Sequence, residues 1–283
     1  MFLESCAVAI TGILAGGLIN TLADHLPSGQ PLRMPQYPDG SRRPKLAWLG
    51  IGAFLFNLRS LPAPSGDELG TLSQSSGPGG ALLSWRYPLT EIATALLMLL
   101  FYADIRADIR DEAALLSTAA LFKFAYAALF VLIAVIDLEH RRIPFAVAFA
   151  LGALALIDAA LIPVSEPGML SAVIGGLIGF ALFYIAFLGG VLFARALSRK
   201  RGKPLEGGAL GFGDVVLMAA AGLAVGFPGI LLAITLSVFT GAAGAIAVVC
   251  ARFMKTGSYQ PFDKIPYGPF IAGSAITLLL IGN

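Results

Sequence analysis

Four carboxylates of this sequence stand in or beside long apolar stretches, where ionisable side chains are rare: Glu91, Asp137, Asp158 and Asp214. A charge in hydrocarbon costs about 3 kcal/mol or more, so each of these residues is a candidate for chemistry. Two carboxyl groups at one depth can share a proton, and one can then activate a water molecule while the other donates a proton to a carbonyl oxygen. A suitable pair among the four would therefore hydrolyse a peptide bond.

Asp137 and Asp214 are the best candidates for that pair. Asp137 ends an apolar run in Ala-Val-Ile-Asp-Leu-Glu-His, and Asp214 opens another in Gly-Phe-Gly-Asp-Val-Val-Leu. A Ser/His or Cys/His alternative has little support, because neither His25 nor His140 has a marked nucleophile beside it.

Each acid also has a simpler interpretation. Asp137 could be an interfacial acid offset by Arg141, four residues on. Glu91 could be a residue at the start of a helix, and Asp158 could be structural. A single Gly-x-Gly-Asp string is also a weak motif in a chain with 33 glycines.

The composition indicates that lipid is the solvent of this chain. Of the 283 residues, 57% are hydrophobic and only 13% are charged. Several apolar runs reach the roughly 20 residues that cross a bilayer, so we expect an all-α fold, a polytopic membrane bundle of about eight transmembrane helices. The expected helices cover residues 3–23, 87–104, 113–136, 143–163, 168–194, 213–226, 228–252 and 265–282.

The basic residues predict the orientation of these helices. Of the 19 lysines and arginines, all but Arg106, Arg110 and Lys123 fall in the loops after the first, third, fifth and seventh expected helices. Basic loops stay on the cytoplasmic side during insertion. We therefore expect both termini to lie outside, and Asp137 and Asp214 to lie at the cytoplasmic face.

A long loop separates the first two expected helices. It is rich in proline, glycine and serine, with a tract at 70–80 that predicts flexibility and an apolar patch at 48–58 that is too short to span. We divide the chain into a first transmembrane helix at 1–23, a cytoplasmic loop at 24–86 and a transmembrane core at 87–283.

Charge and cysteine usage exclude two classes of partner. A net charge of +2 without a dense basic run does not suit nucleic acid. Cys6 and Cys250 both fall in apolar stretches and cannot form a cysteine zinc site within one chain, so we expect no metal.

Five motifs, in order along the chain, resemble those of the bacterial prepilin peptidases, also called type IV leader peptidases. One such motif would be weak, but five in order are a specific resemblance that runs through most of the chain. They are Gly16–Asn20 leading to Leu26-Pro27, Arg86–Glu91, Ile136-Asp137 followed by Ile143-Pro144, Gly211–Asp214 and Ile265–Phe270.

The resemblance implies a membrane aspartic endopeptidase of the bacterial inner membrane. Such an enzyme removes the basic leader of type IV prepilins or type II secretion pseudopilins, cutting after a glycine at the cytoplasmic face. Its partners would be the N-terminal segment of that substrate and membrane lipid, and the peptidase reaction would need no cofactor. The family's catalytic aspartates fall on Asp137 and Asp214, and supporting or substrate-binding roles fall on Gly211, Gly213, Pro144, Glu91 and Asn20.

The sequence departs from the family pattern in three ways. Many members bind zinc through two Cys-x-x-Cys pairs in the first loop, whereas residues 24–86 contain no cysteine. Many members also methylate the new N-terminus with S-adenosylmethionine, and the sequence leaves that activity open. Phe145 follows Pro144 where the family often has a polar residue, and His25 stands where arginine is common.

Three other functions stay open. A relaxed intramembrane protease could use the same aspartates on other membrane proteins. A proton- or cation-coupled secondary transporter could use intramembrane carboxylates, although it should show an inverted repeat and acids near the midplane. A noncatalytic scaffold is the third.

Overall fold

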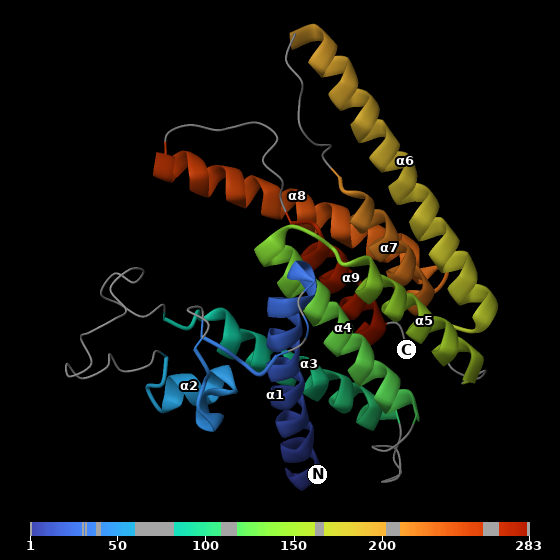
Figure 1. Ribbon diagram of the computed structural model, residues 1–283. Coiled ribbons are helices and arrows are strands. Elements are labelled where there is room, and N and C mark those ends of the chain that lie inside the picture. The colour runs from blue at the N-terminus through green and yellow to red at the C-terminus, as the bar shows by residue number, and fades with distance from the viewer. Residues whose placement is uncertain are drawn as a thin grey trace. The chain divides into compact units, whose positions relative to one another are not determined.

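The computed structural model describes residues 2–29, 31, 33–37, 41–59, 82–108, 118–161, 167–201, 210–256 and 266–281. The chain forms two compact units, Met1–Ala103 and Asp104–Asn283, drawn in Figure 1. The glycine- and serine-rich tract at 70–80 lies outside the described residues. The division of the chain at residues 23 and 86 stays a prediction.

The described residues fold mainly into helices, and all eight expected helices are present. In the first unit, α1 covers Phe2–His25, α2 covers Gly50–Leu55, and α3 covers Arg86–Asp108 and continues past the unit boundary. Short 3-10 helices follow α1 at Leu26–Ser28 and precede α2 at Lys45–Ala47. The second unit contains α4 (Thr118–His140), α5 (Phe145–Leu161), α6 (Met169–Arg201), α7 (Phe212–Val225), α8 (Gly229–Thr256) and α9 (Gly268–Ile281).

Five of these helices, α1, α3, α4, α6 and α8, are long and apolar enough to cross a membrane. The apolar helices α7 and α9 have 14 residues each. At 1.5 Å per residue they are about 21 Å long, less than the roughly 30 Å of a hydrocarbon core. The predicted fold class, a polytopic helical membrane bundle, is confirmed; that all eight helices cross the membrane stays a prediction.

Close backbone packing holds α7 in the second unit. A Cβ on Gly179 of α6 would lie 2.6 Å from the carbonyl oxygen of Met218, and one on Gly222 would lie 2.7 Å from the carbonyl carbon of Gly175. Small residues of this kind let membrane helices approach closely. The opposite side of α6 is exposed and apolar, as lipid requires, with Ile185 65% exposed. Helix α7 also packs against α5, and α9 packs against α4, α7 and α8.

The turn between α4 and α5 places Asp137 one turn before the end of its helix. Arg141 adopts a left-handed conformation with φ of 51°, and its amide donates to the carbonyl oxygen of Asp137 at 2.8 Å. A left-handed residue just past the last helical one is a common way to end a helix. The carbonyl oxygen of Pro144 then accepts the amides of Val147 and Ala148, which starts α5.

The described part of the long loop has a small core of its own. Tyr37, Ala47, Ala53 and Leu83 are buried together. Leu58, from the apolar patch at 48–58, packs against this core. The guanidinium of Arg43, a residue only 5% exposed, lies 4.4 Å from the ring centre of Tyr87 and 5.8 Å from that of Tyr37. Aromatic and cation–π packing therefore orders this segment.

Candidate active site

Asp137 is a buried carboxylate whose hydrogen bond comes from a distant part of the chain. Its residue exposure is 4%, and its Oδ2 accepts the amide N–H of Gly268 at 2.8 Å. Gly268 is the first residue of α9, so the carboxyl group lies at the positive end of that helix dipole. The N-terminus of α9 thus helps to fix the side chain of an acid on α4.

Asp214 is held by its own helix. It is the third residue of α7 and 8% exposed, and its Oδ2 accepts the amide N–H of Gly211 at 2.8 Å. Its amide in turn donates to the carbonyl oxygen of Gly211 at 3.1 Å. This reciprocal pair is a helix N-cap in which the acid satisfies a backbone donor at the helix start.

The two aspartates lie close enough to interact electrostatically. Like charges in a buried site disfavour ionisation of both groups at once. Each Oδ2 is occupied by an amide, and the structure records no hydrogen bond to either Oδ1 from the described residues. The arrangement therefore leaves one oxygen on each group for a proton or a water molecule.

The other residues of the Gly-Phe-Gly-Asp motif pack against the α4–α5 turn. A Cβ on Gly213 would lie 3.0 Å from Cβ of Ile143, so this glycine permits close approach to that turn. Phe212 packs edge-on against Phe145, with ring centres 6.1 Å apart, and against Phe187 of α6 at 5.9 Å. The phenylalanine that departs from the family pattern after Pro144 thus has a partner two residues before Asp214.

Sequence reasoning missed Tyr267 and Gly268 as residues of the site. The Pro-Tyr-Gly-Pro string was noted only as a motif, without a role. Its composition suggests a turn before a helix, but no local pattern could show that Gly268 contacts a residue 131 positions earlier.

Asn20 and Glu91, the other two predicted site residues, lie together in the first unit. Glu91 is 0% exposed; its Oε1 accepts the amide of Gly50 at 2.6 Å, and its Oε2 accepts that of Ile51 at 2.8 Å. The side-chain amide of Asn20 donates to the carbonyl oxygen of Tyr87 at 3.0 Å and to Oε1 of Glu91 at 3.5 Å. Glu91 therefore fastens the loop helix α2 to α3.

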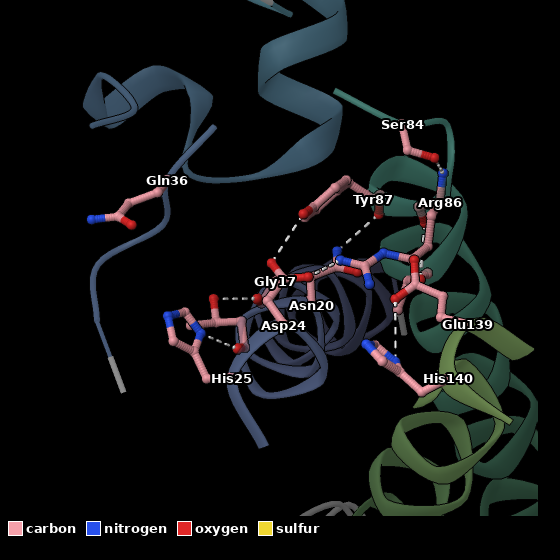
Figure 2. Close-up of polar contacts among 12 residues, drawn as sticks. Gly17, Asn20, Asp24, His25, Gln36, Ser84, Arg86, Tyr87, Glu139 and His140 are labelled. Atoms are coloured by element: carbon pink, nitrogen blue, oxygen red, sulfur yellow. Dashed lines mark hydrogen bonds and ion pairs between the residues drawn. The ribbon is translucent and has the colours of Figure 1, made fainter. Parts of the chain in front are cut away.

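A second polar cluster lies where α1 ends and α3 begins, as Figure 2 shows. Arg86 forms an ion pair with Asp24, and the hydroxyl of Tyr87 donates to Asp24 Oδ2 at 2.9 Å. His25 contacts the carbonyl oxygen of Thr21 at 2.7 Å. The contacts of Asp24 join the end of α1 to the start of α3.

Asp158 has a structural environment, in line with its simpler interpretation. The hydroxyl of Tyr126 on α4 donates to Asp158 Oδ2 on α5 at 2.9 Å. Nearby, Lys123 pairs with Asp104 at 2.7 Å. Among the residues that the structure describes, no group of three or more His, Cys, Asp or Glu side chains could hold a metal ion.

The fold and the site define a class: a polytopic helical membrane protein with two interacting, buried aspartates at helix ends. Residues 124–246 match the type IV leader peptidase family, and both aspartates fall inside that segment. Over that segment the match confirms the resemblance that the motifs predicted.

Individual relatives agree with this assignment. The prepilin leader peptidase/N-methyltransferase of Aeromonas salmonicida (strain A449) is 28% identical over 205 residues, which cover 72% of this chain and 60% of the relative. Those of Aeromonas hydrophila and Stutzerimonas stutzeri are also 28% identical, over 205 and 203 residues, with 72% of this chain and 61% of each relative covered. The matches thus span about three fifths of the length of these relatives. No solved structure matches the chain significantly.

Proposed function

We propose that this protein is a membrane aspartic endopeptidase with Asp137 and Asp214 as its catalytic pair. One observation carries the proposal: two buried carboxyl groups from different helices interact within the segment that matches the leader peptidase family. Each group also keeps one oxygen that the described residues do not occupy, which the reaction requires.

The reaction follows from a pair that shares one proton. The ionised carboxylate takes a proton from a water molecule, whose oxygen attacks the carbonyl carbon of the scissile peptide. The protonated carboxyl group donates its proton to the carbonyl oxygen, which stabilises the tetrahedral intermediate. When the C–N bond breaks, the carboxyl group that received the water proton donates it to the leaving amine. The intermediate's hydroxyl returns its proton to the other carboxylate, which restores the pair.

The substrate we propose is the N-terminal segment of a type IV prepilin or a type II secretion pseudopilin, cut after a glycine. The names of the matched relatives support the prepilin class. The distribution of basic residues supports cleavage at the cytoplasmic face of a bacterial inner membrane, with both termini outside. The peptidase reaction itself uses only the two carboxyl groups and water.

Methyl transfer is a second candidate, because the matched relatives are named N-methyltransferases as well as peptidases. Its methyl donor would be S-adenosylmethionine, as the family resemblance implies. Two acids near Asn20 in the described part of the first unit, Asp24 and Glu91, already accept hydrogen bonds from protein groups. We therefore assign no residue to that cofactor and propose methylation only as an activity to be measured.

The test is co-expression with a prepilin in bacterial membranes, read out by the mass of the processed substrate. We expect cleavage by the wild type and none by Asp137→Asn or Asp214→Asn. Asp158→Asn is the matched control, because it replaces another carboxyl group of the same unit that contacts Tyr126. A product heavier by one methyl group would establish methyl transfer. Cleavage that survives loss of either aspartate contradicts the proposal, and an inactive wild type would contradict either the prepilin substrate or the peptidase assignment itself.

A further inference from the structure

The turn Tyr267-Gly268, before and at the start of α9, connects four helices around Asp137. The amide of Gly268 makes the one hydrogen bond to the Asp137 carboxyl group that the structure records among the described residues. This turn lies outside residues 124–246, so the family match does not cover it.

Position 268 requires glycine because there is no room for a side chain, and not because of its backbone conformation. Its φ is not in the left-handed region, whereas those of Gly29 and Gly226 are. A Cβ at position 268 would lie 2.9 Å from Oδ2 and 3.1 Å from Cγ of Asp137. Both distances are shorter than ordinary carbon contacts. Any side chain here would therefore push the Asp137 carboxyl group out of its present position.

Tyr267 fixes the turn from its other side. Its hydroxyl donates to the carbonyl oxygen of Ser237 on α8 at 3.0 Å, and Ser237 is 0% exposed. Its ring centre lies 6.1 Å from that of Phe183 on α6 and 6.0 Å from that of Phe270 on α9. The turn is thus tied to α6 and α8 as well as to Asp137 on α4.

We propose that Tyr267 and Gly268 are positioning residues of the peptidase: Tyr267 fixes the turn, and Gly268 orients the Asp137 carboxyl group through its amide and its missing side chain. This inference rests on the proposed function, because the position that matters is the one in which Asp137 shares a proton with Asp214. It extends the site to the last helix that the structure describes.

The test compares Gly268→Ala with Gly273→Ala in the purified full-length protein, using a prepilin peptide. Gly273 is the matched control, because it lies on the same helix and a Cβ there would meet nothing within 4 Å. A displacement of about 1 Å can cost about a hundredfold in rate, so we expect Gly268→Ala to lower kcat ten- to a hundredfold. We expect KM to stay within about twofold of the wild-type value and the pH–rate profile to move, since the altered group titrates. Gly273→Ala should match the wild type in all three.

Tyr267→Phe is the second variant, which keeps the ring and removes only the hydroxyl. Loss of this hydrogen bond, whose acceptor is buried, should lower the unfolding temperature slightly and lower kcat of the folded enzyme by about threefold. An active wild type with equal kcat values for Gly268→Ala and Gly273→Ala would overturn the positioning role alone. So would a Gly268→Ala protein whose activity falls only in proportion to its unfolded fraction. An inactive wild type would overturn the peptidase proposal and this inference with it.

Discussion

Two buried carboxylate sites of this molecule differ in how many of their oxygens accept backbone amides. In the first unit, both oxygens of Glu91 accept backbone amides, from Gly50 and Ile51. In the second unit, Asp137 and Asp214 each have one oxygen bonded to an amide, among the donors that the structure describes. A carboxylate with both oxygens bonded is suited to hold backbone in place, whereas a half-occupied one can still bind water or a proton.

The largest expected effect is a loss of activity, without a loss of stability, when either aspartate of the pair is replaced. Asp137→Asn or Asp214→Asn should lower cleavage by at least about a thousandfold, because the two groups act as a unit. Asparagine keeps the acceptor oxygen for the amide of Gly268 or Gly211, so the unfolding temperature should stay close to that of the wild type. Cleavage assays and thermal unfolding in detergent measure the two quantities. A variant that loses activity only because it unfolds would count against the catalytic assignment.

Glu91→Ala should have the opposite effect, a loss of stability without a direct loss of the catalytic reaction. It leaves the amides of Gly50 and Ile51 without their acceptor, which costs about 3 kcal/mol for a buried charged acceptor. Faster proteolysis within residues 41–59 and a lower unfolding midpoint would measure the loss. If the Glu91→Ala protein kept the wild-type unfolding midpoint but lost peptidase activity, Glu91 would belong to the reaction and not to the structural contacts.

A smaller effect is expected where α6 packs on α7. A Cβ on Gly175 would lie 2.8 Å from the carbonyl carbon of Gly226, so Gly175→Ala should cost about 1–3 kcal/mol through overpacking. Cleavage should fall as well, because α7 carries Asp214. Gly189→Ala is the control on the same helix, where a Cβ meets nothing within 4 Å. Equal unfolding midpoints for the two variants would mean that this packing does not hold the site.

The smallest expected effect concerns the aromatic contact beside Asp214. Phe145→Leu removes the edge-on packing against Phe212 and should cost about 1 kcal/mol or less. Phe149→Leu is the control on α5, since Phe149 is 65% exposed. Denaturant unfolding of both variants measures the difference, and a larger loss for Phe149→Leu would contradict the role of this contact.

The sequence predicted the helices because the length of an apolar run is a local property. The largest boundary difference is at α6, which continues to Arg201 although its apolar run ends near residue 194. Arginine and lysine favour helix, so the charged tail prolongs it to Arg201.

The sequence could not predict which donors meet each acid. Asp214 contacts Gly211, three residues away, and the Gly-x-Gly-Asp motif contains both groups. The donors to Glu91 and Asp137 lie 41 and 131 residues away, at positions that depend on how whole helices pack. Sequence analysis therefore grouped Glu91 with the supporting residues of the site and gave Gly268 no role.

The most direct test of the central claim is a double-mutant cycle on leader cleavage, with Asp137→Asn, Asp214→Asn and both together in the same membranes. If the two groups share one proton and act as a unit, each single variant loses nearly all activity and the double variant is no slower than either. Substantial cleavage by either single variant, or losses that add, would contradict a coupled aspartate pair.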